Sequence, residues 1–183
     1  GNNCSIGSNV IIRKSIIGNN VNILDASIIG KKGFGFFPND KNNIRYPHIG
    51  LVLIEDDVEI GCNNVIDRGS LSNTVIGFNT YIDNQVHIGH NVNIGKNCLV
   101  CAQVGIGGST KIHNNVIIGG QAGIIDNLVV KDNVIIGPRS YVIKSVDENT
   151  YVSGNPARNH KDHVKQDILI SKLPAMYKKI FNK

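Results

Sequence analysis

The chain has 183 residues, a formal net charge of +5 and 41% hydrophobic residues, including 29 Ile, 18 Val and 25 Asn but no Trp. β-Branched residues together with the turn formers Asn and Gly favour short strands and tight turns, which argues against a helical bundle or a coiled coil. No apolar run approaches the ~20 residues of a membrane span, and residues 160–183 hold six Lys and two Asp, so no basic stripe suited to nucleic acid crosses the main body.

The N-terminal segment carries a weak six-residue repeat. The chain begins at Gly1 without an initiator Met or a signal peptide, so we expect a trimmed or processed fragment. Residues 31–57 interrupt the repeat with Gly, Phe and Pro, and they predict a loop extruded from it. Loops on a rigid scaffold often carry function, which makes this loop a candidate part of a site. The early aliphatic positions are Ile6, Ile12, Ile17, Ile23 and Ile29.

From residue 76 the six-residue repeat is regular over twelve positions. A period of six does not fit the 3.6-residue turn of a helix. Three short strands and three bends per coil would close a triangular prism, which is the parallel β-helix that hexapeptide repeats build. We expect the aliphatic side chains to point inward and Asn and Gly to occupy the bends, where φ is often positive. The aliphatic positions are Ile76, Ile82, Ile88, Ile94, Val100, Ile106, Ile112, Ile118, Ile124, Val130, Ile136 and Val142.

The end of the chain departs from the repeat. Apolar residues from Val164 to Met176 at roughly helical spacing predict a helix that is broken near Pro174. We therefore divide the chain into a β-helix domain, residues 1–157, and a helical extension, residues 158–183. This basic helix has two interpretations: a cap over the open end of the solenoid, and a docking site for an acidic partner.

Four segments carry a resemblance to one enzyme family. They are Ile82–Asn91 (Ile-Asp-Asn-Gln-Val-His-Ile-Gly-His-Asn), Ile66–Ser70 (Ile-Asp-Arg-Gly-Ser), Gly33–Phe36 and Gly105–Thr110. Over about residues 5–160 the chain resembles UDP-3-O-acylglucosamine N-acyltransferase. The resemblance implies an all-β fold, a left-handed parallel β-helix. It also implies a reaction of lipid A synthesis, in which a 3-hydroxyacyl chain moves from acyl carrier protein to the 2-amine of the nucleotide sugar.

The resemblance further implies partners and a location. We expect a homotrimer with active sites between subunits, a nucleotide-sugar substrate, and an acyl carrier protein whose phosphopantetheine arm is the donor. No bound cofactor and no metal are expected. The basic extension would suit an acidic acyl carrier protein. The four Cys do not form a disulfide framework at this chain length, so we expect a reducing compartment: the cytoplasm, or an organelle in a eukaryotic source.

His90 is the candidate general base. Amide formation from a thioester needs an unprotonated amine and a stabilised oxyanion, and imidazole titrates in the right range for the first task. Asp83, in the neighbouring hexapeptide, is expected to hold the imidazole tautomer and stabilise its cation. With about 18 residues per coil, as the family fold implies, Gly108 stacks over His90 and offers a backbone N–H to the oxyanion.

Six further residues are expected to contact substrate. The resemblance places Tyr141 near the end of the hydrocarbon channel, where a smaller residue should favour longer chains. Two departures from the family concern the nucleotide sugar: we expect the family's additional N-terminal domain, which grips the uridine, to be missing, and Asn127 stands in place of a second histidine. Exposed Phe pairs often mark contacts, here with an acyl chain or a trimer neighbour. The expected substrate-binding residues are Phe34, Phe36, Asn91, Gln103, Asn127 and Tyr141.

Alternative functions stay open. One is another hexapeptide enzyme that transfers an acyl or acetyl group to a sugar, and another is a non-catalytic solenoid scaffold. A zinc carbonic anhydrase on the same fold would need His87, His90 and His113 to converge, although His113 falls on a different edge of the prism. Cys98 and Cys101 do not predict a zinc site, because no second Cys pair follows. We interpret His87 as surface or site-lining, and assign no function to His48, His113, His160 and His163.

Overall fold

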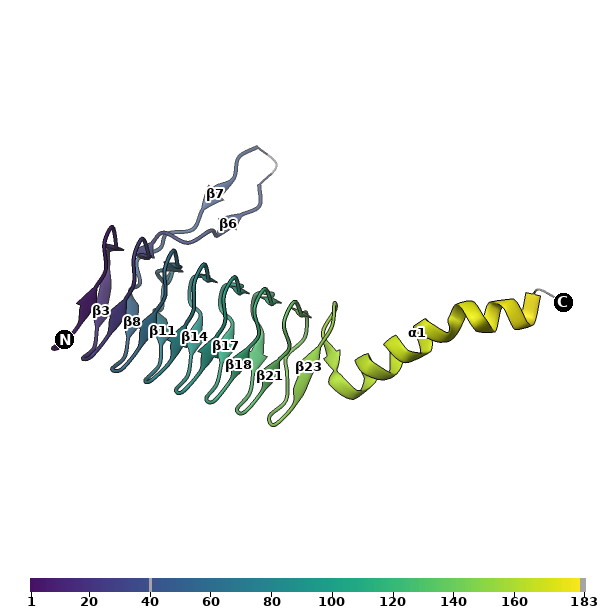
Figure 1. The fold of residues 1–183 in the computed structure, drawn as a ribbon. Helices are drawn as coiled ribbons and strands as arrows, with labels where there is room; N and C mark the ends of the chain where they lie inside the picture. Colours follow the sequence, from purple (N-terminus) through teal and green to yellow (C-terminus); the bar gives the residue numbers. More distant parts are fainter. Residues whose placement is uncertain (40, 182–183) are drawn as a thin grey trace.

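The computed structural model describes residues 1–39 and 41–181. Its body is a three-sided solenoid of about eight coils, from which one hairpin and one helix project (Figure 1). Successive strands of each side come from successive coils and pair in parallel. The predicted parallel β-helix is therefore confirmed.

Each coil contributes one short strand to each of three sheets. Sheet A consists of β1 (Ser5–Ile6), β4 (Asn22–Ile23), β9 (Glu59–Ile60), β12 (Tyr81–Ile82), β15 (Leu99–Val100), β18 (Ile117–Ile118), β21 (Ile135–Ile136), β23 (Tyr151–Ser153) and the antiparallel β24 (Arg158–Asn159). Sheet B consists of β2 (Ile11–Ile12), β5 (Ile28–Lys31), β10 (Val65–Asp67), β13 (His87–Ile88), β16 (Gly105–Ile106), β19 (Gly123–Ile124) and β22 (Tyr141–Val142). Sheet C consists of β3 (Ser15–Ile17), β8 (Val52–Ile54), β11 (Thr74–Ile76), β14 (Asn93–Ile94), β17 (Lys111–Ile112) and β20 (Val129–Val130).

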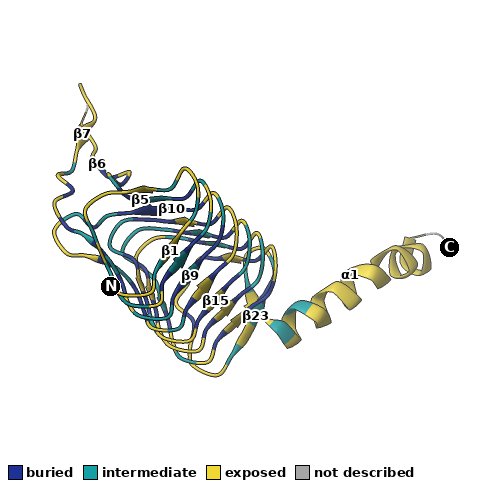
Figure 2. Ribbon diagram, turned by 60° about the vertical axis from the view of Figure 1, so that its left-hand side comes forward, coloured by how far each residue is buried: buried dark blue, intermediate teal, exposed yellow. Residues whose placement is uncertain are grey.

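The core is a column of aliphatic side chains inside the prism. All twelve residues of the regular repeat, from Ile76 to Val142, are buried, and none is more than 3% exposed. Within sheet B, Ile88, Ile106 and Ile124 occupy the same register in successive coils. Each buried aliphatic side chain stabilises the fold by roughly 1.5–3 kcal/mol, so the repeat itself supplies the driving force for stacking. Figure 2 shows the buried positions lining the inside of the coils.

The bends follow a rule that the sequence predicted only in part. Asn residues such as Asn97 and Asn115 do adopt positive φ, both at 56°. The prediction that Gly also does so is wrong: among the described glycines only Gly30 and Gly154 have positive φ. Gly95 is needed for close packing instead, because a Cβ there would lie 2.7 Å from the backbone of His113 in the next coil.

The three edges of the prism differ in their side chains. On the asparagine edge, between sheets C and A, the amides of Asn79, Asn97, Asn115, Asn133 and Asn149 form a ladder of hydrogen bonds 2.9–3.3 Å long. On the glutamine edge, between sheets A and B, Gln85, Gln103 and Gln121 form a similar ladder. The open edge, between sheets B and C, carries Asn91, Ser109 and Asn127 at the equivalent positions, and their side chains form no such ladder.

The extruded loop is shorter than predicted. It leaves after β5 and forms a hairpin of β6 (Phe36–Phe37) and β7 (Ile44–Arg45). The solenoid resumes at β8, whose residues Val52 and Ile54 are buried, and not after residue 57. Ile54 lies six residues before the inward Ile60, so the repeat already continues there.

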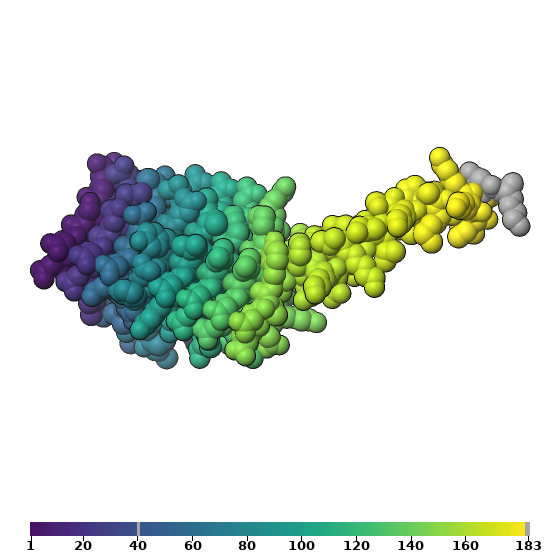
Figure 3. Space-filling model, turned by 60° about the horizontal axis from the view of Figure 1, so that its bottom comes forward, coloured from purple at the N-terminus to yellow at the C-terminus, as the bar shows by residue number. Residues whose placement is uncertain are grey.

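Helix α1 (His160–Phe181) confirms the helical extension but corrects two details. It runs through Pro174 without a break, because the helix is exposed along its length and the carbonyl that loses its donor can be hydrated. It does not cap the solenoid: β24 pairs with β23 and sends the helix outward (Figures 1 and 3). No helix in the described part of the chain is long and apolar enough to cross a membrane.

Candidate active site

His90 lies on the open edge, directly after β13, beside a cavity of about 300 Å³. Asp67 of the preceding coil and His87 of β13 line the cavity, and Phe34 of the extruded loop closes one side. The remaining wall is backbone, contributed by Gly89, Gly105, Gly107 and Gly108 together with Ile106. The cavity therefore combines the half-buried imidazole of His90 and the exposed imidazole of His87 with a floor of glycines, which leaves room for a ligand against the coil.

Asn91 fixes the tautomer of His90. The Asn91 Oδ1 atom accepts hydrogen bonds from the backbone N–H of Ser70 (3.0 Å) and lies 2.9 Å from His90 Nδ1, while Asn91 Nδ2 donates to the carbonyl of Ser72. A backbone N–H can only donate and a carbonyl can only accept, so the amide orientation is determined. Nδ1 of His90 must then carry the proton, and Nε2 presents its lone pair to the cavity.

Asp83 does not orient His90 within the chain. It follows β12 at the glutamine edge, where its carboxylate accepts hydrogen bonds from Asn84 and from the backbone N–H of Ala102. Asp83 and His90 are seven residues apart in the sequence, which is about one side of the prism and much less than one coil. Their side chains therefore lie on different edges of the prism. The predicted partnership is replaced by Asn91, whose amide is fully engaged with the protein.

Gly108 lies against the His90 ring, as the coil length predicts. A Cβ on Gly108 would be 2.9 Å from both Cε1 and Nε2 of His90, and Ser109 N–H donates to the His90 carbonyl. Within the described residues no acceptor takes a hydrogen bond from Gly108 N–H. Elsewhere in the solenoid, as at Lys96, such an N–H donates to a side chain 18 residues further along the chain. The residue 18 positions after Gly108 is Asp126, and its carboxylate accepts a hydrogen bond from the Asn127 side chain instead. A free backbone donor beside the imidazole is the arrangement that an oxyanion needs.

His48 belongs to the site although no sequence pattern singled it out. The residue is 2% exposed, and its ring stands edge-on to His90, with ring centroids 5.2 Å apart. Nδ1 of His48 donates to the carbonyl of Tyr46. Burial lowers the pKa of His48, and the nearby His90 lowers it further. The loop returns to the solenoid at β8, two coils below His90, and places its last residues against the His90 ring, but this follows only from the fold.

Asp67 was part of a motif but not a predicted site residue. It is 1% exposed, forms an ion pair with Lys31 of the preceding coil, and lies 3.7 Å from Nε2 of His87. The buried carboxylate is thus held between two basic groups at the wall of the cavity. This placement supports the site-lining interpretation of His87.

A glycine strip runs along sheet B beyond the cavity. The outward positions of successive strands are His87, Gly105, Gly123 and Tyr141. A Cβ on Gly105 would meet nothing within 4 Å, and one on Gly123 would meet only the Tyr141 ring, at 3.5 Å. The strip is therefore an open track two coils long, about 10 Å, that ends at Tyr141.

The other predicted contact residues differ in where they lie relative to the cavity. Phe34 is 78% exposed at the cavity and packs edge-to-face on Phe36, 4.9 Å away. Asn127 lies on the open edge one coil beyond Gly108, where it donates to the Gly108 carbonyl. Gln103 lies in the glutamine ladder on another edge, so within one chain it does not meet His90.

No three His, Cys, Asp or Glu side chains of the described residues gather as metal ligands would. His113 follows β17 of sheet C, whereas His87 and His90 belong to sheet B and its edge. The arrangement that a zinc carbonic anhydrase would need is therefore not formed within the described chain.

The comparisons with known proteins agree with this geometry. Residues 73–108 match the family described as bacterial transferase hexapeptide (six repeats). An 89-residue segment is 49% identical to UDP-3-O-acylglucosamine N-acyltransferase of Rhizobium rhizogenes, and an 87-residue segment is 52% identical to the Nitrobacter hamburgensis enzyme. The predicted resemblance is confirmed. These segments cover 49% and 47% of the chain but only 25% and 24% of the relatives, so the chain matches about a quarter of their length.

Solved structures match over nearly the whole chain. UDP-N-acetylglucosamine O-acyltransferase from Moraxella catarrhalis covers 98% of the chain with a TM-score of 0.65 and 26% identity, and the match includes 76% of that protein. The Francisella novicida UDP-N-acetylglucosamine acyltransferase covers 97% of the chain and 69% of its own, with a TM-score of 0.71 and 23% identity. The fold is therefore the left-handed β-helix of these acyltransferases, as predicted.

Proposed function

We propose that this chain is the acyl-transfer domain of an N-acyltransferase that moves a 3-hydroxyacyl chain from acyl carrier protein to the 2-amine of UDP-3-O-acylglucosamine. The observation that carries the proposal is the pairing of His90, whose free Nε2 faces the cavity, with the unoccupied N–H of Gly108. Both residues lie within residues 73–108, which match the bacterial transferase hexapeptide family, and segments of the chain are similar to enzymes of that name.

The chemistry needs one base and one oxyanion donor. Nε2 of His90 removes a proton from the amine as its nitrogen attacks the thioester carbonyl, and a C–N bond forms. The N–H of Gly108 stabilises the negative charge on the carbonyl oxygen. When the C–S bond breaks, the imidazolium returns the proton to the departing thiolate. Asn91 keeps Nδ1 protonated throughout, so that Nε2 alone accepts and returns the proton.

The glycine strip suits the acyl chain. It starts at the cavity wall, is bare of side chains over Gly105 and Gly123, and ends at Tyr141. Each methylene that leaves water is worth ~0.8 kcal/mol, so a chain laid along the strip would be bound along its whole length. The thioester would then face His90 from the donor's phosphopantetheine arm.

A homotrimer would close the site. Sheet A carries an outward apolar stripe, in register from coil to coil, that no other described part of the chain covers: Tyr81, Leu99, Ile117, Ile135 and Tyr151. These side chains are about 40–45% exposed, and a continuous apolar strip of this kind marks an interface. Equilibrium sedimentation should give three times the chain mass, and a monomer at micromolar concentration would contradict the assembly.

The proposal is tested by an acylation assay with the purified chain, a 3-hydroxyacyl thioester of acyl carrier protein and the monoacylated nucleotide sugar. Amide formation that His90→Ala abolishes is the expected result. Because the Moraxella catarrhalis neighbour is a UDP-N-acetylglucosamine O-acyltransferase, UDP-N-acetylglucosamine is offered as a second acceptor. Ester formation in place of amide formation would favour that second function, and the absence of both products would favour the scaffold.

A further inference from the structure

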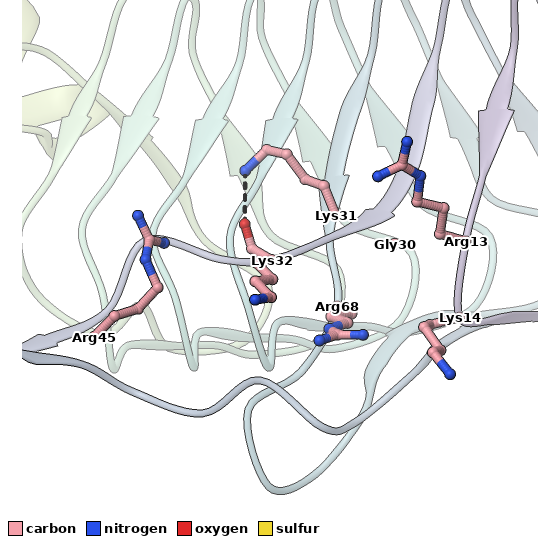
Figure 4. Close-up of a pocket in the computed structure, with 7 residues that line it drawn as sticks. All are labelled: Arg13, Lys14, Gly30, Lys31, Lys32, Arg45 and Arg68. Carbon is pink, nitrogen blue, oxygen red and sulfur yellow. Dashed lines mark hydrogen bonds between the residues drawn. The ribbon is translucent and has the colours of Figure 1, made fainter.

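A basic cleft adjoins the His90 cavity and takes no part in the transfer chemistry. It surrounds Gly30 and has a volume of about 710 Å³ (Figure 4). Its other lining residues are Arg13, Lys14, Lys31, Lys32, Arg45 and Arg68. Apart from Gly30, every lining residue is a cation.

The cluster is created by the fold. Residues 1–159 carry a net charge of only +1, because the terminal segment holds +4 of the total. Arg13, Lys31 and Arg68 come from the ends of β2, β5 and β10, which are neighbouring strands of sheet B, and Arg45 comes from the hairpin. Gly30 permits the close stacking, since its φ is +82° and a Cβ there would collide with the Arg13 carbonyl.

Most of these charges lack a counter-charge. Among the described residues, only Lys31 of the six forms an ion pair, with Asp67. Arg45 donates to the carbonyl of Gly33 and lies over the Phe36 ring, 4.5 Å from its centroid. Nε of Arg68 is buried and has no hydrogen-bond partner in the described structure. Neighbouring cations repel one another, so an anion in the cleft would relieve repulsion and satisfy open donors.

The cleft lies next to the reacting atoms. Asp67, the partner of Lys31, lines the His90 cavity. Gly33, which Arg45 holds, packs on His90: a Cβ there would be 2.8 Å from the His90 Cβ. Along sheet B the cleft occupies the coils that precede β13, so it begins about 5 Å from the histidine coil and extends to about 15 Å.

We propose that this cleft binds the diphosphate of the acceptor, and so holds the sugar amine at His90. This inference rests on the proposed function, since it takes the acceptor to be a nucleoside-diphosphate sugar. Two linked phosphates carry several negative charges, and guanidinium groups bind phosphate oxygens in pairs. The spacing fits: a sugar ring separates the amine from the first phosphate, and one coil separates the cavity from the first cations. An acidic protein is a less suitable occupant, because it would dock on an exposed basic surface and not inside a concave cleft.

The first test is direct binding and needs no turnover. Inorganic pyrophosphate is titrated by calorimetry into the full chain, into Arg13→Ala/Lys32→Ala, and into the control Lys96→Ala. Arg13 and Lys32 are exposed, so the double variant should fold, and Lys96 is an exposed cation on the asparagine edge. We expect the double variant to bind at least ~10-fold more weakly, since each charged hydrogen bond is worth about that factor, and the control to bind like the parent. Equal affinity in all three, or equal binding of sulfate and pyrophosphate, would overturn the proposal.

The second test separates the sources of the phosphate. A nucleoside-diphosphate sugar should displace pyrophosphate, and phosphopantetheine should not; the reverse order would assign the cleft to the donor and overturn the proposal. In the acylation assay the double variant should raise KM for the nucleotide sugar ~10-fold and leave KM for the acyl carrier protein unchanged. If the parent binds pyrophosphate through these residues but transfers no acyl group, the proposed function fails while the anion site stands. If the parent is active but the variant keeps its KM, the cleft proposal alone is wrong.

Discussion

The open edge and the asparagine edge of the prism are built from the same repeat but differ in their hydrogen bonds between coils. On the asparagine edge, the backbone N–H of Lys96 donates to the Asn114 side chain of the next coil, at 2.9 Å, and the side-chain amides continue into a ladder. On the open edge, the N–H of Gly108 has no such partner among the described residues, and Asn91 turns to His90 instead. A repeat becomes a site where the coil-to-coil ladder is interrupted and donors are left for a ligand.

His90→Ala should show the largest difference between the edges. We expect turnover to fall by ~10²–10⁴, the usual worth of general acid–base catalysis, with an unchanged circular dichroism spectrum. Asp83→Asn, on the glutamine edge, should have a much smaller effect, because Asp83 bonds to Asn84 and Ala102 and not to His90. An equal loss in Asp83→Asn would mean that a second subunit brings this carboxylate to the histidine.

Gly108→Ala and Gly95→Ala compare glycines of the two edges. The new Cβ at Gly108 would lie 2.9 Å from the His90 ring, which can move aside. Activity should therefore fall ~100-fold, because the ring is displaced from its position beside the oxyanion donor. The new Cβ at Gly95 would press on the His113 backbone at 2.7 Å, which cannot yield, so stability should fall by about 1–3 kcal/mol. Urea unfolding and turnover of both variants measure the two effects, and the same loss of activity in both would refute the distinction.

Asn91→Ala tests the tautomer assignment against Asn97→Ala. Both residues have positive φ, so both variants should lose about 1–2 kcal/mol of stability. Only Asn91→Ala should also lower kcat, by ~10-fold or more, because Nδ1 of His90 loses its acceptor. Asn91→Asp should recover part of kcat, since a carboxylate also accepts from Nδ1–H. A pH profile identical to the parent in Asn91→Ala would contradict the positioning role.

Tyr141→Ala tests the end of the glycine strip, with Tyr177→Ala as control. The two tyrosines are 46% and 62% exposed, but Tyr141 ends the strip on sheet B and Tyr177 lies on helix α1. Removing the Tyr141 ring should extend the track, and two further buried methylenes would shift kcat/KM toward longer chains by about tenfold. Chain-length profiles from a thioester series measure this shift. An unaltered profile in Tyr141→Ala would remove the strip from the acyl site without affecting the role of His90.

The smallest expected effect is on pH-dependent stability. Burial lowers the pKa of His48 below 6.5, so the unfolded chain binds more protons than the folded chain as the pH falls below that value. The stabilisation from neutral His48 is present above pH 6.5 and is lost as the pH falls toward the folded pKa. The protection of backbone amides in residues 33–39 and 41–50, measured as hydrogen exchange relative to the intrinsic rate at each pH, should therefore fall between pH 7 and pH 5. His48→Gln should reduce that dependence, and a pH dependence equal to that of the parent would contradict the assignment.

The residue pattern along the chain was enough to predict the solenoid. Twelve aliphatic residues at a period of six fit only one way of burying them all, so the core followed from the pattern. The 18-residue coil that the family resemblance implied then predicted the stacking of Gly108 on His90. The end of the loop could have been found in the same way, because Ile54 already continues the register into Ile60.

The residue pattern was not enough to predict which side chains meet at the open edge, because these contacts form only when the chain is folded. Asn91 in place of Asp83, the buried His48, and the six cations around Gly30 all depend on how edges align and where the hairpin folds back. A six-residue period fixes which residues point inward, since burial depends on the repeat alone. It does not fix contacts between outward side chains, because these come from different coils and from a loop that lies outside the repeat.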